Sequence, residues 1–110
     1  MIKKIDTIEQ FEEVLTKEET FYLLKHSLTC PISQEAYNEY EKFSKENPSI
    51  PAYYLAVQEA RPLSNEIAEK FAIKHESPQA ILFSTGKAEW NASHWKITKK
   101  SLEQAINGEH

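Results

Sequence analysis

Cysteine is the residue that this sequence most nearly lacks. Cys30 is the only cysteine among 110 residues. A lone cysteine excludes a disulfide within the chain and a zinc cluster built of cysteines. Any chemistry of Cys30 therefore proceeds without a second thiol from the same chain.

An excess of positive charge and a long apolar run are also missing. The net charge of -4 argues against a nucleic-acid binder, because affinity for phosphate backbones comes mainly from clustered Lys and Arg. Asp6 and Glu9 interrupt the N-terminal "MIKKIDTIEQF", and no apolar stretch approaches the length of a membrane span. We therefore expect no signal peptide, no membrane association and a cytoplasmic location.

Repeats, low-complexity tracts and linkers are absent as well. The composition, 40% hydrophobic and 27% charged, is ordinary for a globular protein. A chain of 110 residues can bury a core around one sheet but is too short for two independent cores. We expect a single domain over residues 1–110.

Short apolar runs alternate with amphipathic stretches, which indicates an α/β protein. Strands are expected at residues 2–5, 21–27, 51–59, 79–83 and 87–92. Helices are expected at residues 6–15 (capped by Asp6 or Thr7), 31–46, 64–72 (capped by Ser64) and 98–107. Gly86 in "STGK" predicts a hairpin between the last two strands. The alternation of these strands and helices, ending in a hairpin and a last helix, is typical of a thioredoxin-like fold, with a central mixed sheet of four to five strands flanked by helices.

The segment "SLTCPIS" places Cys30 between a buried strand and a helix. Pro31 is suited to the first helical position, where its missing N–H costs nothing. Unpaired N–H groups and the positive end of the helix dipole favour a thiolate at such a position. We therefore expect a reactive thiolate at Cys30. The alternative is a buried, inert cysteine, as lone cysteines often are.

Ser33 stands where a Cys-x-x-Cys motif carries its second cysteine. Its hydroxyl cannot resolve a mixed disulfide, although it can donate a hydrogen bond toward the Cys30 sulfur. The chemistry expected of Cys30 is therefore monothiol chemistry. The alternative for Ser33 is a solvated first-turn residue that bonds its own backbone.

"SLTCPIS" together with the later "KHESPQAILF" resembles the YtxJ-type monothiol bacilliredoxins of the thioredoxin superfamily, over essentially the whole chain. The resemblance implies that Cys30 removes bacillithiol, a small thiol that some bacteria use in place of glutathione, from proteins that carry it in a mixed disulfide. The residues that match the family motif are Thr29, Cys30, Pro31, Ile32 and Ser33. Pro78 matches the cis-proline of the superfamily.

Two loops supply further candidates for substrate contact. A cis bond before Pro78 would position Ser77 to pair with an extended substrate, whereas a trans proline would only begin the strand. His75, before this loop, and His94 and Trp95, in the loop closing the hairpin, are expected at the edge of the sheet where Cys30 lies. Each has an alternative reading, as solvated histidines and a packing tryptophan. Lys25 and His26 are expected on opposite faces of their strand, so at most one of them faces the thiol.

Three functional classes remain open. The first is a monothiol disulfide reductase with bacillithiol as co-substrate and S-thiolated proteins as partners, acting as a monomer with no metal or tightly bound cofactor. The second is a binding module, either a redox sensor or an adaptor of the same fold. The third is a monothiol iron–sulfur carrier. It is disfavoured by Pro31, which stiffens the loop that must admit a cluster.

Overall fold

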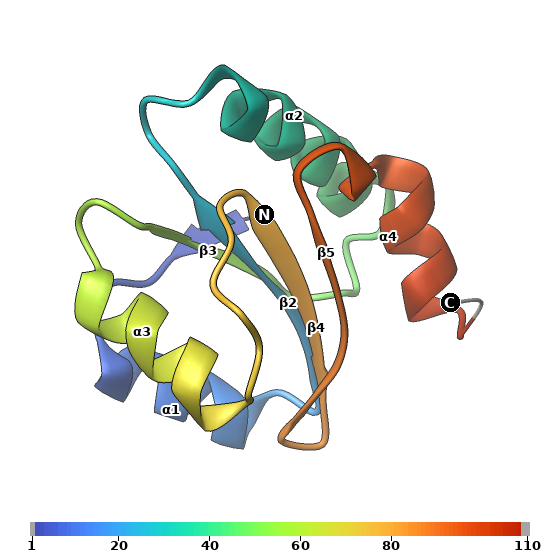
Figure 1. The fold of residues 1–110 in the computed structure, drawn as a ribbon. Helices are drawn as coiled ribbons and strands as arrows, with labels where there is room; N and C mark the ends of the chain where they lie inside the picture. Colours follow the sequence, from blue (N-terminus) through green and yellow to red (C-terminus); the bar gives the residue numbers. More distant parts are fainter. Residues whose placement is uncertain (1, 109–110) are drawn as a thin grey trace.

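The computed structural model describes residues 2–108, which form a five-stranded sheet flanked by helices (Figure 1). The strands are β1 (Ile2–Lys4), β2 (Thr20–His26), β3 (Ala52–Ala56), β4 (Gln79–Ser84) and β5 (Lys87–Ser93). The helices are α1 (Ile8–Lys17), α2 (Pro31–Glu46), α3 (Arg61–Lys70), α4 (Lys99–Ile106) and the short 3-10 helix η1 (His94–Lys96). The α/β class predicted from the sequence is confirmed.

The strand order β1-β3-β2-β4-β5 makes the sheet mixed. β3 pairs in parallel with β1 and β2, whereas β4 is antiparallel to both β2 and β5. Lys25 near the end of β2 lies opposite Gln79 at the start of β4. The loop after β2, which carries Cys30, and the loop before β4, which carries Pro78, therefore meet at the same edge of the sheet.

Helices cover both faces of the sheet, α1 and α3 on one side and α2 and α4 on the other (Figure 1). Strand β2 is central and contributes to both apolar layers, because successive side chains point to opposite faces. Phe21 and Leu23 enter the layer under α1 and α3, and Tyr22 and Leu24 enter the layer under α2 and α4. This explains why "FYLLKH" is continuously apolar up to its last two residues.

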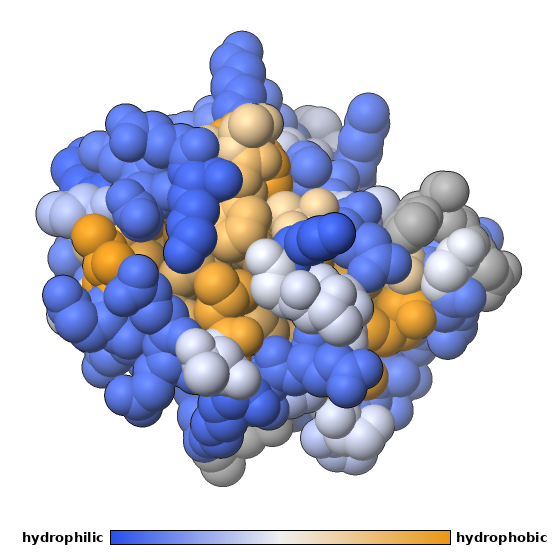
Figure 2. Space-filling view, turned by 90° about the horizontal axis from the view of Figure 1, so that it is seen from below, coloured by the Kyte–Doolittle hydropathy of each residue, from blue (hydrophilic) through white to orange (hydrophobic). Residues whose placement is uncertain are grey.

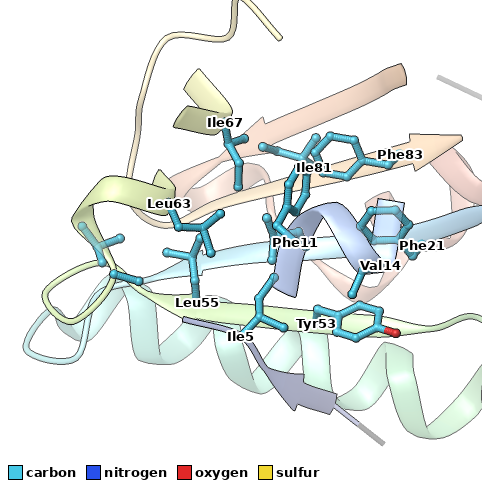
Figure 3. Packing of buried hydrophobic residues seen from close by; sticks show 13 residues of the cluster. Ile5, Phe11, Val14, Phe21, Tyr53, Leu55, Leu63, Ile67, Ile81 and Phe83 are labelled. Atoms are coloured by element: carbon cyan, nitrogen blue, oxygen red, sulfur yellow. The ribbon is translucent and has the colours of Figure 1, made fainter. Parts of the chain in front are cut away.

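Aromatic rings pack among aliphatic side chains in the layer under α1 and α3 (Figure 3). The rings of Phe21 and Phe83 stack with centroids 5.0 Å apart, and Phe11 from α1 meets Phe83 edge-on at 5.4 Å. Leu63 and Ile67 close the layer from α3. Fully burying each such side chain contributes roughly 1.5–3 kcal/mol, so this layer anchors the strands that carry the site.

Local sequence signals explain most of the element boundaries. Thr7 begins α1 through a capping box with Gln10, and Thr98 begins α4 through a capping box with Ser101. In the β4–β5 hairpin, Thr85 and Gly86 both have positive φ, 50° and 79°, as the tight turns that match strand twist require. The predicted hairpin is therefore confirmed.

The predicted start of α3 is wrong by three residues. The helix begins at Arg61 with Ala60 as its cap, and Pro62 lies in its first turn, where proline is well tolerated. Ser64 is inside the helix and buried, so its hydroxyl is turned to a tertiary contact and does not cap. Ala72, expected inside the helix, is exposed at φ 53°, beyond the end of α3.

The segment that contains His94 and Trp95 is also placed differently from the expectation. It does not close the hairpin but forms η1, which connects β5 to α4. The Trp95 side chain is 70% exposed. The two residues therefore lie beside the start of α4.

Figure 2 shows the molecule from below Figure 1, at the end away from the start of α2. Hydrophilic side chains cover most of this face and frame a band of apolar residues. Within residues 2–108, none of the helices combines the length and the apolar character that crossing a membrane requires.

Candidate active site around Cys30

Cys30 is the N-cap residue of α2. Its backbone is extended, with φ -102° and ψ 122°, and Pro31 occupies the first helical position, as the sequence predicts. The Gln34 N–H donates the first helical bond to the Cys30 carbonyl at 3.1 Å. The side chain of Cys30 makes no capping hydrogen bond and is partly exposed. The sulfur therefore lies at the amino end of a sixteen-residue helix with access to solvent.

Ser33 does not face the Cys30 sulfur. The predicted hydrogen bond between them is absent from the described residues, because Ser33 lies on the buried face of α2 and is 0% exposed. Its Oγ accepts from the Ser27 N–H at 2.7 Å and lies 3.2 Å from His26 Nδ1. Ser33 therefore holds the start of the loop between β2 and α2.

His26 is the buried partner of Ser33. Its ring packs against Tyr37 and Tyr54, with centroids 5.1 Å and 6.1 Å away. Burial lowers the pKa of His26 below its usual value, and the backbone of Ser33 opposes that shift only in part. The ring is therefore neutral at neutral pH. Because the Ser33 oxygen already accepts from the Ser27 N–H, its hydroxyl hydrogen is free to donate to an unprotonated His26 Nδ1.

We expect Ser33→Ala to destabilise the fold while leaving a reactive thiol. The substitution leaves the Ser27 N–H and His26 Nδ1 without their partner, which costs about 1–3 kcal/mol for buried groups. Chemical denaturation should show this loss, and alkylation of Cys30 should still occur. The matched control is Ser44→Ala in the same helix. A variant with no alkylation at all would contradict this division of roles.

Gln58 is a residue that the sequence analysis missed. Its Nε2 donates to Ser27 Oγ at 2.9 Å and to Thr29 Oγ1 at 3.4 Å, and its Oε1 accepts from the Leu28 N–H at 3.1 Å. Gln58 follows β3, and β3 runs parallel to β2, so the loops after both strands meet at one edge. The sequence carries no local signal for this contact, because it depends on which strands lie side by side.

The loop before β4 carries the second predicted element of the site. The Ser77–Pro78 bond is cis, as predicted. The Pro78 carbonyl accepts from the His94 N–H at 3.0 Å, which ties this loop to η1. Ser77 Oγ is buried and has no hydrogen-bond partner among the described residues.

A groove of about 590 Å³ lies beside the start of α2. It is lined by Pro31, Ile32, Glu35, Ala36 and Glu39 of α2 and by His94, Trp95, Ile97 and Thr98 of the segment leading into α4. The structure thus brings together four residues that were predicted separately: Pro31, Ile32, His94 and Trp95. His94 has φ 56°, and its Nε2 lies 3.6 Å from Glu76 Oε1.

Carboxylates give the groove its charge. The Lys99 N–H donates to Glu39 Oε1 at 2.9 Å and lowers the pKa of that carboxyl, and Lys42 Nζ lies 3.3 Å from its other oxygen. Glu35 is exposed one turn earlier. Within residues 2–108, no three His, Cys, Asp or Glu side chains are grouped closely enough to hold a metal ion.

His75 lies on the other face of the sheet, away from this groove. Its Nδ1 is 3.2 Å from Lys25 Nζ and 3.2 Å from Ser64 Oγ. His75 lies at the expected edge of the sheet, where β2 ends and β4 begins, but its partners Lys25 and Ser64 are on the α3 side of that edge. Its contact with substrate stays a prediction. Burial, and then the Lys25 charge, lower the pKa of His75.

Lys25 itself is 0% exposed and donates to the Ser64 carbonyl at 3.0 Å. Burial lowers its pKa to about 8. His26 faces α2 through Ser33, so the two neighbours point to opposite faces, as predicted. Of the two, His26 is the one on the Cys30 side.

Comparison with known proteins identifies the family of the chain. The family model described as monothiol bacilliredoxin BrxC matches residues 3–102. A solved structure described as a candidate oxidoreductase with a thioredoxin fold is 46% identical, with 96% of this chain and 93% of that chain covered, at a TM-score of 0.91.

Two thioredoxins show likeness of the fold alone. The oxidised thioredoxin of Plasmodium falciparum is 16% identical, with 98% of this chain and 97% of that chain covered, at a TM-score of 0.78. The thioredoxin of Fasciola hepatica is 14% identical, with 98% and 99% covered, also at 0.78. With the family match across residues 3–102 and the 46% identical structure, these results show that the chain belongs to the monothiol bacilliredoxin BrxC family and has the fold of thioredoxin-type oxidoreductases.

Proposed function

We propose that this protein is a cytoplasmic monothiol disulfide reductase that removes bacillithiol from S-bacillithiolated proteins. The observation that carries the proposal is the position of the only cysteine, partly exposed at the N-cap of α2 and beside a groove. Ser33, which takes the place of the second cysteine of a Cys-x-x-Cys motif, is buried and bonded to the loop. Resolution must therefore come from a thiol outside the chain.

The reaction needs two exchanges. The Cys30 thiolate attacks the bacillithiol sulfur of the mixed disulfide, the S–S bond to the client protein breaks, and the client cysteine leaves as a thiolate. A second bacillithiol, as its thiolate, then attacks the bacillithiol sulfur attached to Cys30. This step releases bacillithiol disulfide and restores the Cys30 thiolate, so electrons and atoms balance without a metal.

The groove and the loop before β4 are proposed to hold the substrate. His94 and Trp95 line the groove opposite the first turns of α2, and the His94 N–H links them to Pro78. Ser77 and Pro78 in that neighbouring loop would extend the binding surface beyond the groove. The exposed Trp95 ring offers an apolar platform for the substrate. A small thiol and an adjoining stretch of client chain fit a groove of about 590 Å³.

The test uses one client protein with a single cysteine, prepared with either bacillithiol or glutathione in the mixed disulfide. With excess bacillithiol, release of the free client is followed by mass spectrometry. We expect rapid release from the bacillithiolated client and slower release from the glutathionylated one. No release from either would refute the proposal. A Cys30 adduct that forms but is never resolved would instead favour the redox sensor.

We expect Trp95→Ala to weaken substrate binding with little effect on stability. A 70% exposed ring contributes little to the core, whereas loss of one apolar contact in a binding groove costs about 1–3 kcal/mol, or roughly 10- to 200-fold in kcat/KM. The readout is kcat/KM for the bacillithiolated client. Asn91→Ala is the matched control, because Asn91 is exposed in β5, carries no charge and does not line the groove. Equal loss in both variants would count against the groove.

A further inference from the structure

The segment Ser27–Thr29, which we call the thiol loop, connects β2 to Cys30 and belongs to no helix or strand. A segment of this kind takes its geometry from side-chain bonds, since no ladder or helix satisfies its backbone. Ser33 supports one end by accepting from the Ser27 N–H at 2.7 Å. The remaining length, next to Cys30, is contacted by Gln58.

The amide of Gln58 meets all three residues of the thiol loop. Its Oε1 accepts from the Leu28 N–H at 3.1 Å, while its Nε2 donates to Ser27 Oγ at 2.9 Å and to Thr29 Oγ1 at 3.4 Å. Only a side-chain amide offers an acceptor and two donors from one planar group. Gln58 is therefore hydrogen-bonded both to the backbone of the loop and to its two hydroxyl side chains.

The base of Gln58 is itself fixed. The Val57 N–H donates to the His26 carbonyl at 2.9 Å, which joins this turn to the end of β2. The N–H groups of Glu59 and Ala60 both donate to the Ala56 carbonyl at 2.9 Å and close the turn before α3. Gln58 thus extends from a rigid turn toward a loop that has no ladder of its own.

We propose that Gln58 is a positioning residue for Cys30: it holds the thiol loop so that the sulfur faces a disulfide seated in the neighbouring groove. This inference rests on the proposed function for its substrate. In-line attack on a disulfide depends on geometry, and a misplacement of about 1 Å costs on the order of 100-fold in rate. A small alkylating agent approaches from any direction, so its reaction is insensitive to that geometry.

The decisive variant is Gln58→Ala, and Glu59→Ala is the matched control. Glu59 lies on the same turn, but it pairs with Lys4 of β1, which β3 separates from β2 and the thiol loop. We expect Gln58→Ala to slow transfer from the bacillithiolated client about tenfold. Alkylation of Cys30 by iodoacetamide, at a pH where the thiol is fully ionised, should stay within about twofold of the wild type. Glu59→Ala should match the wild type in both.

Amide hydrogen exchange at Leu28 gives a readout that needs no substrate. Gln58→Ala should lose protection at this amide, and Gln58→Glu should restore it, because a carboxylate still accepts from the Leu28 N–H. Glu59→Ala should leave it unchanged. Unchanged Leu28 protection in Gln58→Ala would overturn the inference, as would wild-type transfer by that variant. If the wild type fails on the bacillithiolated client, the proposed function is wrong, and Leu28 exchange still decides whether Gln58 holds the loop.

Discussion

Cys30→Ser is expected to abolish de-thiolation, with a loss of more than about 1000-fold. The chain has no second cysteine to take over. A serine hydroxyl is not ionised at neutral pH and forms no disulfide, so the first exchange cannot begin. After one turnover without added bacillithiol, mass spectrometry should find one bacillithiol attached to wild-type Cys30 and none on the variant.

The same variant should fold at least as well as the wild type. Cys30 occupies the N-cap of α2 without a side-chain capping bond. Serine is among the preferred N-cap residues, and its hydroxyl can accept from the backbone N–H of Ser33, a gain of about 0.5–1 kcal/mol. Chemical denaturation of both proteins checks this. Residual de-thiolation in a folded Cys30→Ser protein would show that another group performs the attack.

Lys25→Met is expected to change how stability depends on pH. Burial lowers the pKa of Lys25 from 10.5 to about 8. Between these values the unfolded chain binds more protons than the folded protein, so the free energy of unfolding of the wild type rises with pH. Below pH 8 both states are protonated, and the full penalty for the buried charge, on the order of 3 kcal/mol, is present.

Methionine fills a similar volume without a charge, so Lys25→Met removes the pH-dependent penalty for burying the ammonium group. It also removes the hydrogen bonds to the Ser64 carbonyl and His75 Nδ1, an offset that is the same at each pH while His75 is neutral. We therefore expect the stability of Lys25→Met relative to the wild type to fall by about 2 kcal/mol between pH 7 and pH 9.5.

The measurement is urea denaturation at several pH values up to 9.5. Above that range a second group changes the stability. Burial raises the pKa of Tyr53 to about 12, so this tyrosine ionises first in the unfolded chain, and the free energy of unfolding then falls as the pH rises. Lys3→Met, at an exposed position in β1, is the matched control and should follow the wild-type pH profile. Parallel profiles for the wild type and Lys25→Met would show that the buried ammonium carries no such penalty.

Local patterns were sufficient for most of the fold. The capping box at Thr7, the proline at Pro31 and the tight turn at Gly86 act within a few residues, so their effects can be predicted without knowing the tertiary structure. The start of α3 was mispredicted because Ser64 looks like a cap. Its hydroxyl instead meets His75, eleven residues away, a contact that no local pattern reports.

The position of Cys30 at a helix start follows from its immediate neighbours, and the cis bond at Pro78 followed from the family motif. The surroundings of Cys30 depend on which strands lie side by side. The parallel pairing of β2 with β3 brings Gln58 to the thiol loop, and the antiparallel pairing of β2 with β4 sends His75 to Lys25 and away from the groove. Residues 30 to 50 positions apart meet there only because sheet register brings them together, and register is set by packing of the whole core.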